Sequence, residues 1–322
     1  MKRILILFAL ILLVGGCSEL KKIEQTKELM GTIVTITIYD ENEDKAKEIM
    51  EKAFDEIERL DNLLSNYKND SEVSILNKNS FIENPSDDLI YNTKKSLYYS
   101  DISNGAFDIT VQPILDLYKD SFESKKRAPT GEEIEDALKL VGYEKIRLKY
   151  RNISMQPGMK ITLGGIAKGY AVDRAVSVLQ WNNTIKHALV SIAGDIKAIG
   201  NKGGANKWVI ALENPRNKGQ YIAKINLDNK AVSTSGDYER YFEPTKKFHH
   251  IIDPETGYSA AKLISVTIIA DKAVDADAIA TAVFVLGPDE GLQLIEKLEN
   301  VEGLLITPDK KIIKSSEFDS CC

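Results

Sequence analysis

The chain has 322 residues, of which 43% are hydrophobic and 28% charged, so it has the composition of an ordinary globular protein with a sizeable core. Its 42 lysines and arginines are scattered among 48 acidic residues, and the net charge of −6 excludes the basic footprint of a nucleic-acid-binding protein. Only three cysteines occur, which excludes a disulfide framework.

The N-terminus has the features of an export signal. Met1-Lys2-Arg3 is basic, an apolar run extends from Ile4 to Val14, and Gly15-Gly16 precedes Cys17. The run is too short to span a bilayer, and small residues before a cysteine are typical of a lipoprotein signal. We therefore predict that residues 1–16 are removed and that lipidated Cys17 is the only membrane contact of an exported protein on the extracytoplasmic face. The alternative is an ordinary signal with a chance cysteine.

The first ordered elements follow a short polar stretch. Residues 17–28 predict a flexible tether. From Gly31 to Tyr39 β-branched residues dominate and apolar residues alternate, which predicts a strand. An apolar stripe from Ala46 to Leu64 predicts a long helix, and Pro85 and the residues after it open a second helix toward Ser103.

Later segments alternate less regularly between strand and helix patterns. Thr130-Gly131-Glu132-Glu133 is a capping box, and Gly142 follows the helix that it opens. Strands are predicted at 145–150, 160–163, 188–192, 208–212, 221–227 and 263–270, and helices at 168–180, 275–286 and 289–298. Because strict βαβ alternation is absent, the class is α+β. We predict one large unit over residues 29–318 and a mobile tail over 319–322, which contains Cys321 and Cys322.

A glycine-rich turn is the sharpest local motif. The segment from Leu163 to Asp173 ends a strand with Gly164-Gly165 and opens a helix that carries Lys168. Glycines let a phosphate approach the backbone, and the helix N-terminus favours an anion. The spacing fits neither a Walker A loop nor a Rossmann fingerprint. The alternative is a tight strand-to-helix turn required by packing.

Two further motifs carry polar chemistry. Asp277 and Thr281 are four residues apart on one helix and present a carboxylate and a hydroxyl that suit Mg²⁺, although capping of the helix is the alternative. His249 and His250 precede the turn Asp253-Pro254-Glu255-Thr256-Gly257 and face opposite sides of a strand, so at most one enters a given site as a base or hydrogen-bond donor. No second histidine or cysteine cluster suggests zinc.

Several loops have weaker signals. Gly105-Ala106-Phe107-Asp108 and Ser65-Asn66-Tyr67 place aromatic rings beside polar groups, which suits a flat ligand or a simple turn. The segments 191–196 and 232–238 are interpreted first as turns.

Taken in order, these segments resemble the ApbE family of FAD:protein FMN transferases. The matching segments start with Met30-Gly31-Thr32 and continue with Ser65-Asn66-Tyr67, Gly105 to Asp108, Gly164 to Asp173, Gly194-Asp195, Ser233 to Asp237, His250 to Gly257 and Asp275 to Gly287. The resemblance implies a T-fold-like α+β architecture of mixed or antiparallel sheets with packed helices. It also implies a Mg²⁺-dependent transfer of FMN from FAD to a protein threonine or serine, with release of AMP.

The same resemblance assigns roles to residues. Mg²⁺ is expected on Asp277, Thr281 and the carbonyl of Ala167, and Lys168 and His250 are expected to act on the phosphate and the acceptor hydroxyl. FAD is expected to contact Met30, Tyr67, Ala106, Phe107, Asp108, Gly165, Lys168, Asp195, His250 and Ile251. The partners implied are flavin-carrying subunits of the sodium-pumping NADH:quinone reductase (Nqr) or Rnf-type redox complexes.

Two departures from the family pattern bear on the ligand geometry. Ala193 stands where many relatives have glycine, and Ser191 where they usually have asparagine. The alternatives within reach of the same residues are a Mg²⁺-dependent FAD pyrophosphatase and a non-enzymatic FAD-binding lipoprotein. Self-flavinylation is disfavoured, because Tyr258-Ser259 follows Thr256-Gly257 where the acceptor motif has alanine and a hydroxyl residue.

Overall fold

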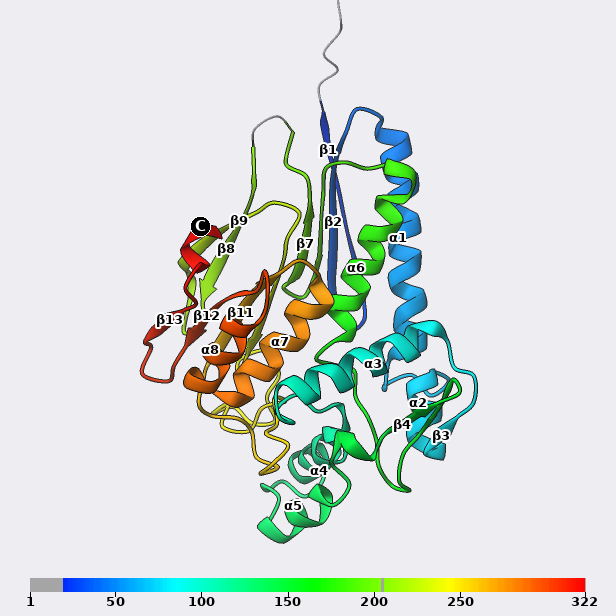
Figure 1. Ribbon diagram of the computed structural model, residues 1–322, viewed down its shortest axis with the longest axis vertical. Helices are drawn as coiled ribbons and strands as arrows, with labels where there is room; N and C mark the ends of the chain where they lie inside the picture. The colour runs from blue at the N-terminus through cyan, green and yellow to red at the C-terminus, as the bar shows by residue number, and fades with distance from the viewer. Residues whose placement is uncertain (1–19, 204–205, 322) are drawn as a thin grey trace, which may run out of the picture.

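The computed structural model describes residues 20–203 and 206–321 (Figure 1). Its largest element is an antiparallel sheet with eight strands in the order β1-β2-β6-β7-β10-β11-β12-β13. A three-stranded sheet, β3-β5-β4, and the β8-β9 hairpin accompany it. The predicted α+β class with antiparallel sheets and packed helices is confirmed.

The elements have the following bounds. The main sheet consists of β1 Lys21–Leu29, β2 Thr32–Asp40, β6 Ala188–Ile192, β7 Asp195–Ile199, β10 Ala231–Gly236, β11 Ser265–Ala270, β12 Glu302–Ile306 and β13 Ile312–Lys314. The smaller sheets consist of β3 Phe81–Ile82, β4 Arg147–Lys149, β5 Asn152–Ser154, β8 Trp208–Asn214 and β9 Asn217–Leu227. The helices are α1 Glu43–Leu64, α2 Glu72–Asn79, α3 Asp87–Ile102, α4 Gln112–Glu123, α5 Gly131–Leu138, α6 Ala167–Leu179, α7 Ala273–Leu286 and α8 Pro288–Lys297.

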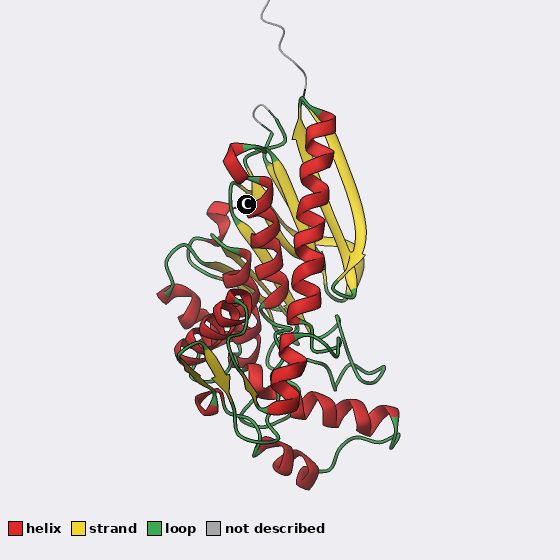
Figure 2. Cartoon of the chain, turned by 90° about the vertical axis from the view of Figure 1, so that its right-hand side faces the viewer, coloured by secondary structure: helices red, strands yellow, loops and turns green. Residues whose placement is uncertain are grey.

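The main sheet is covered on both faces. Helices α1, α6 and α7 pack on one face, and the β8-β9 hairpin packs on the other (Figures 1 and 2). In β11, Ile268 therefore belongs to the helical core, whereas its neighbour Ile269 belongs to the core under the hairpin. Every residue of β11 is buried, which explains why its sequence, with only Ser265 and Thr267 polar, does not alternate between apolar and charged residues.

A third, aromatic core fixes the segment that carries the histidines. Tyr118 and Phe122 of α4 stack on Phe242, and both rings also contact Phe248. Because Phe242 and Phe248 bracket the loop before His249, the α4–α5 layer holds that loop in place.

The predicted tether over residues 17–28 is wrong from Lys21 onward. Lys21 to Leu29 form β1, an edge strand that pairs with β2 along its whole length. Only Ile23 is buried in this strand, so its sequence lacks the apolar alternation that marks an ordinary strand. Pairing with β2, not apolar content, orders it.

The predicted mobile tail is also wrong within the described residues. Phe318 to Cys321 form a 3-10 helix, Phe318 is fully buried, and Cys321 packs against the core under the hairpin. Burial of the Phe318 ring, with Cys321 beside it, docks this terminal segment on the fold.

Two other expectations need correction. Residues 160–163 form no strand, because the side chain of Asn77 satisfies both the N–H of Ile161 (2.7 Å) and its carbonyl (2.9 Å). Residues 231–236 form strand β10 and not a turn, and their serines lie in a sheet that packs under α7.

The predicted signal over residues 1–16 and the lipidation of Cys17 lie outside the described residues. Among the described residues, no helix has both the length and the apolarity needed to cross a membrane.

We predict that Ile23→Ala lowers the free energy of unfolding by about 2–4 kcal/mol, because β1 belongs to the core and loses a buried side chain. Urea denaturation monitored by circular dichroism measures it. The matched control is Glu28→Ala in the same strand, an exposed position where the change stays within about 0.5 kcal/mol. Equal stability of both variants would mean that β1 is a tether after all.

Candidate active site

One cavity of about 670 Å³ lies where the helices, the main sheet and the aromatic layer meet. Every residue that the sequence assigns to the site lines this cavity, except Asp195. The lining residues are Met30, Tyr67, Ala106, Phe107, Asp108, Gly165, Ala167, Lys168, His250, Ile251, Asp277 and Thr281. Segments separated by nearly the whole chain therefore converge on one wall.

Helices α6 and α7 are joined by reciprocal capping. Asp277 of α7 accepts a hydrogen bond from Gly169 N–H in the first turn of α6 (3.0 Å). In return, Asp173 of α6 accepts from Ala273 and Val274, the first two residues of α7 (3.1 and 3.0 Å). Each carboxylate satisfies N–H groups that a helix start leaves without partners.

Gly169 makes this close approach possible. A Cβ atom at this position would lie 2.3 Å from the carbonyl oxygen of Ala273 and 2.8 Å from Cβ of Asp277. Helix packing therefore requires this glycine. At Gly165, four residues earlier, an added Cβ would lie 3.0 Å from Thr281 Oγ1, a tight contact that a small shift of that side chain would relieve. The glycine motif therefore serves packing at Gly169, and it also forms part of the cavity wall at Gly164 and Gly165.

A buried charge cluster lies at the floor of the cavity. The ammonium group of Lys168 bonds to Asp195 and lies 3.8 Å from Asp277 Oδ1. Burial opposes the charge of Lys168, but Asp195 and Asp277 outweigh it and raise the pKa of Lys168 above its usual range. Burial, followed by the like charge of Asp195, raises the pKa of Asp277 to about 7.

Asp195 lies behind Lys168 and does not line the cavity. It is 1% exposed, and its second oxygen accepts a hydrogen bond from Ser233 of β10. Asp195 positions the ammonium group of Lys168, and its contact with FAD stays a prediction.

The two adjacent histidines have opposite roles, as expected for neighbours in an extended segment. His249 is buried against Phe284; its Nε2 bonds to the carbonyl of Ala260 (2.9 Å), and its Nδ1 accepts from Ile251 N–H. His250 lines the cavity, and its Nδ1 bonds to the carbonyl of Arg240 (3.0 Å). Because a carbonyl only accepts, Nδ1 of His250 carries the proton and Nε2 keeps a free lone pair.

The protonation of His250 follows from its surroundings. Burial lowers the pKa of His250 to about 4, and the charges of Arg240 and Lys168 act in the same direction. The ring is therefore neutral near pH 7.

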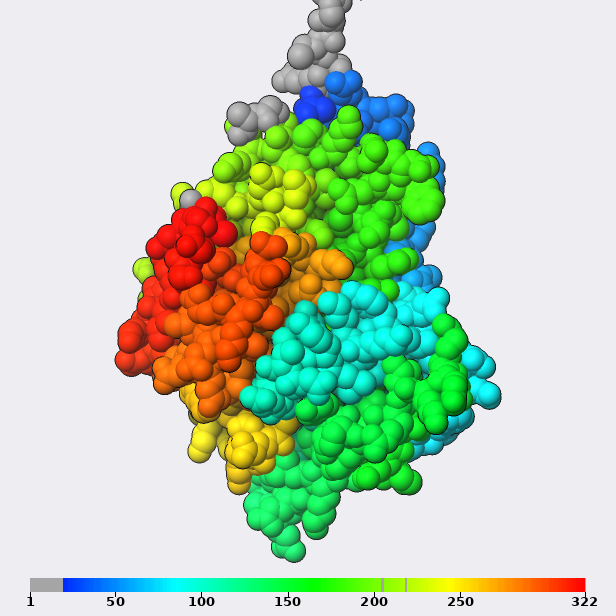
Figure 3. Space-filling view, viewed as in Figure 1, coloured from blue at the N-terminus to red at the C-terminus, as the bar shows by residue number. Residues whose placement is uncertain are grey.

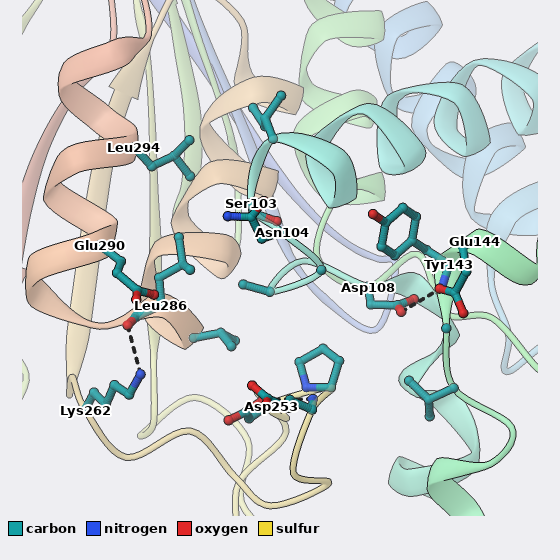
Figure 4. Close-up of a pocket in the computed structure, with 18 of the residues that line it drawn as sticks. Ser103, Asn104, Asp108, Tyr143, Glu144, Asp253, Lys262, Leu286, Glu290 and Leu294 are labelled. Carbon is teal, nitrogen blue, oxygen red and sulfur yellow. Dashed lines mark hydrogen bonds between the residues drawn. The ribbon is translucent and has the colours of Figure 1, made fainter.

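Asp108 forms part of the wall between this cavity and a second cleft of about 640 Å³ (Figure 4). Its carboxylate accepts from the N–H and hydroxyl of Thr110 and from Tyr143 N–H (2.9 Å), and burial raises its pKa to about 6. These bonds fix the Ala106-Phe107-Asp108 turn. The second cleft shares only Ala106 and Asp108 with the predicted site, and its opposite side is α8 with Leu286 and Lys262.

Sequence reasoning missed two cations on the cavity wall. Arg240 and Lys119 both line the cavity, and no carboxylate in residues 20–203 or 206–321 pairs with either. Nothing in the local sequence distinguishes them from other surface charges. Asn66, which belongs to the predicted Ser65-Asn66-Tyr67 loop, donates a hydrogen bond from its side chain to Gln112 of α4 (2.7 Å). This bond ties the loop of Tyr67 to the aromatic layer.

A model of the ApbE family matches residues 30–305. The FAD:protein FMN transferase of Haemophilus influenzae is 32% identical over 330 residues, which covers 97% of this chain and 94% of that protein. The enzyme of the same name from Treponema pallidum is 29% identical and covers 94% and 89%.

Solved structures are similar as well. The ApbE protein of Thermotoga maritima superposes with a TM-score of 0.85 at 33% identity, covering 94% of this chain and 99% of that one. The apo flavinyl transferase ApbE of Pseudomonas stutzeri gives a TM-score of 0.82 at 30% identity, with coverage of 94% and 97%.

We predict that Gly169→Ala lowers the free energy of unfolding by about 1–3 kcal/mol and weakens FAD binding, because the methyl group forces α6 away from α7. Urea denaturation and quenching of flavin fluorescence measure the two effects. Gly131→Ala, at the first position of α5 with open space around it, serves as the control and leaves both unchanged or slightly stabilises the fold. If Gly169→Ala behaved like this control, the contact between the helices would not be needed.

Proposed function

This chain belongs to the ApbE family, and we propose that it transfers FMN from FAD to a hydroxyl group of an acceptor protein and releases AMP. The observation that carries the proposal is the convergence of Lys168, Asp277, Thr281 and the neutral ring of His250 on one cavity. The two relatives described above are named FAD:protein FMN transferase, and the alignment with this chain covers 94% and 89% of their lengths.

The reaction needs three things from the protein. The acceptor oxygen forms a bond to the phosphorus on the FMN side of the diphosphate, and the bond from that phosphorus to the bridging oxygen breaks. AMP leaves with the electron pair of that bond, and the acceptor hydroxyl gives up its proton. The cavity must therefore supply a base, positive charge at the diphosphate and a surface for the rings.

His250 is our proposed base. The carbonyl of Arg240 fixes the proton on Nδ1, so the free Nε2 lone pair can accept the proton of the hydroxyl. The low pKa of His250 keeps this lone pair available at neutral pH, although it also limits the strength of the base.

The donor set suits a magnesium ion. Asp277 and Thr281 are one turn apart on α7, and Ala167 opens α6 on the same wall. Among the described residues, no group of three or more histidine, cysteine or acidic side chains is placed to hold a metal. The proposed ion would therefore need water and phosphate oxygens as its other ligands. When bound, Mg²⁺ would neutralise the diphosphate and polarise its phosphoryl oxygen.

Lys168 and the start of α6 provide positive charge that does not depend on a metal. Lys168 stays protonated because Asp195 and Asp277 raise its pKa, and the first turn of α6 directs its positive dipole end toward the cavity wall. Arg240 and Lys119 add two further cations on the same wall. Together they offset the charge that a dinucleotide diphosphate brings.

The rings of FAD have apolar and aromatic surfaces available. Tyr67 lines the cavity with 75% of its surface exposed, and Phe107 and Met30 form buried or half-buried parts of the wall. An exposed tyrosine at a cavity is well suited to stack on a flat ligand.

We further propose that the acceptor is a threonine or serine of an exported redox subunit of the Nqr or Rnf type. The predicted export signal supports the compartment, and the family resemblance supports the partner class. A Mg²⁺-dependent pyrophosphatase and a storage protein for FAD are the outcomes that would contradict this proposal.

The deciding experiment incubates the protein with FAD, Mg²⁺ and a peptide that contains a threonine or serine acceptor motif. We expect mass spectrometry to find FMN attached to the peptide and one AMP per adduct. Free FMN with AMP and no adduct would identify a pyrophosphatase, and intact bound FAD would identify a storage protein.

We predict that Asp277→Asn lowers transfer by at least about 100-fold without unfolding the protein, because the amide oxygen still accepts from Gly169 N–H while the charge is lost. The control is Asp275→Asn on the same helix, whose carboxylate pairs with Lys95 outside the cavity. Transfer at the normal rate in Asp277→Asn would make our metal assignment wrong.

We predict that kcat/KM for transfer falls as the pH drops through about 4 and does not change through His250 between pH 6 and 8. The base must be unprotonated, and a lowered pKa keeps it so down to that range. His250→Ala should lower the rate by about 10²–10⁴-fold. The third histidine provides the control, since His187→Ala lies outside the cavity and should leave the profile unchanged. An acid limb near pH 6.5 that is lost in His250→Ala would show that His250 is not held neutral, whereas a limb near pH 7 in both proteins would belong to Asp277.

A further inference from the structure

One end of the molecule gathers the start of the described chain and several loops, and we call it the entry pole. Lys21 pairs with Asp40 at the end of β2, and Tyr39 N–H donates to the carbonyl of His187 (2.9 Å). Gly203 lies against Leu20, since a Cβ there would be 2.9 Å from Leu20 Cδ1. The pole consists of residues 20–22, 39–45, 181–187, 200–203 and 206–207, and Figures 1 to 3 show this end uppermost.

The pole exposes an unusual aromatic side chain. Trp181 follows α6 and is 71% exposed, whereas Trp208, the other tryptophan, is 3% exposed. The segment after Trp181 leads directly to His187 and β6, so the ring belongs to the end at which the chain enters. Exposing the apolar ring of a tryptophan to water is unfavourable, whereas the headgroup region of a membrane favours this side chain.

The pole is also more basic than the chain as a whole. It contains Lys21, Lys22, Lys45, Lys186, Lys202 and Lys207 against Asp40, Glu41, Glu43 and Asp44, in a protein with a net charge of −6. Glu43 is already paired with Lys47, and it lies 3.7 Å from Lys21. For Lys186 and Lys207, no carboxylate of the described residues forms an ion pair, so these charges are available to an anionic surface.

The predicted lipidation site also lies close to this pole in the sequence. Cys17, where the sequence predicts lipidation, precedes Leu20 by three residues, so a lipid on it would lie within about 10 Å of this pole. An anchor at this distance would hold the pole beside the headgroup surface, where even weak contacts form because their effective concentration is high.

We propose that the entry pole binds the headgroup surface of an anionic bilayer directly, through Trp181 and the lysines around it. This contact adds to the predicted lipid anchor and replaces our expectation that the lipid is the only membrane contact. It is independent of the chemistry in the cavity.

The contact would set the height of the active site. Strand β1 runs nine residues from Lys21 at the pole to Leu29, and Met30 follows on the cavity wall. At about 3.3 Å per residue, the cavity would lie about 30 Å from the lipid surface. An acceptor hydroxyl must then be presented at that height, which suits a domain that projects from a membrane complex.

The test uses the chain from Ser18 onward, which keeps the fold because all three cores are formed by residues from Ile23 on. We expect it to float with vesicles of phosphatidylcholine containing 30% phosphatidylglycerol, and its tryptophan emission to shift to the blue. Trp181→Ser should remove the shift, and Lys186→Glu combined with Lys207→Glu should weaken binding at least about tenfold.

The controls carry equivalent changes at the other end of the molecule. Tyr150→Ser removes a ring that is 85% exposed, and Lys126→Glu with Lys149→Glu reverses two exposed charges. Both variants should bind the vesicles like the parent chain. All variants should transfer FMN to a soluble peptide at the parent rate, which separates this proposal from the proposed function.

Three results would overturn the proposal. The parent chain could fail to float, the pole variants could bind as well as the controls, or inorganic phosphate could displace the protein more strongly than chloride of equal ionic strength. The last result would identify a site for a free phosphate ion instead of a lipid surface.

Discussion

The contact between α6 and α7 is the constraint on which the site depends. Each helix starts without N–H partners of its own, and each receives them from a carboxylate of the other, Asp277 for α6 and Asp173 for α7. Gly169 lets the two backbones approach closely enough for these bonds. The same bonds orient Asp277 toward Lys168. The packing of the two helices therefore also places the charged side chains at the floor of the cavity.

That floor is electrostatically unusual. Two buried carboxylates share one ammonium group, and burial with mutual repulsion raises the pKa of Asp277 to about 7. A second positive charge would relieve this repulsion, because the cluster carries more negative than positive charge when both carboxylates are ionised. Such a buried charge cluster adds little to the stability of the fold, because well-packed apolar side chains of the same volume would be equally stable there.

The aromatic layer of α4 and α5 contributes at a distance. It contains no proposed catalytic residue, yet Tyr118 and Phe122 hold Phe242 and Phe248 on either side of the histidine loop. The carbonyl of Arg240, two residues before Phe242, fixes the tautomer of His250, two residues after Phe248. Loops carry functional groups best when a rigid scaffold positions them, and here the scaffold is a separate small core.

Local signals in the sequence, namely apolar periodicity, glycines and polar motifs, gave the class of the fold and the main helices. Of the residues assigned to the site, all but Asp195 line the cavity, but they are only part of its lining. The sequence did not reveal β1, since an edge strand with one buried residue is ordered by pairing with β2 and not by its own pattern. It gave no sign that Asp195 lies behind Lys168 or that Arg240 lines the cavity. Whether a charged side chain lines a cavity or supports a neighbour depends on contacts between segments far apart in the chain, such as Asp195 with Lys168 and Ser233, and only the tertiary structure decides these.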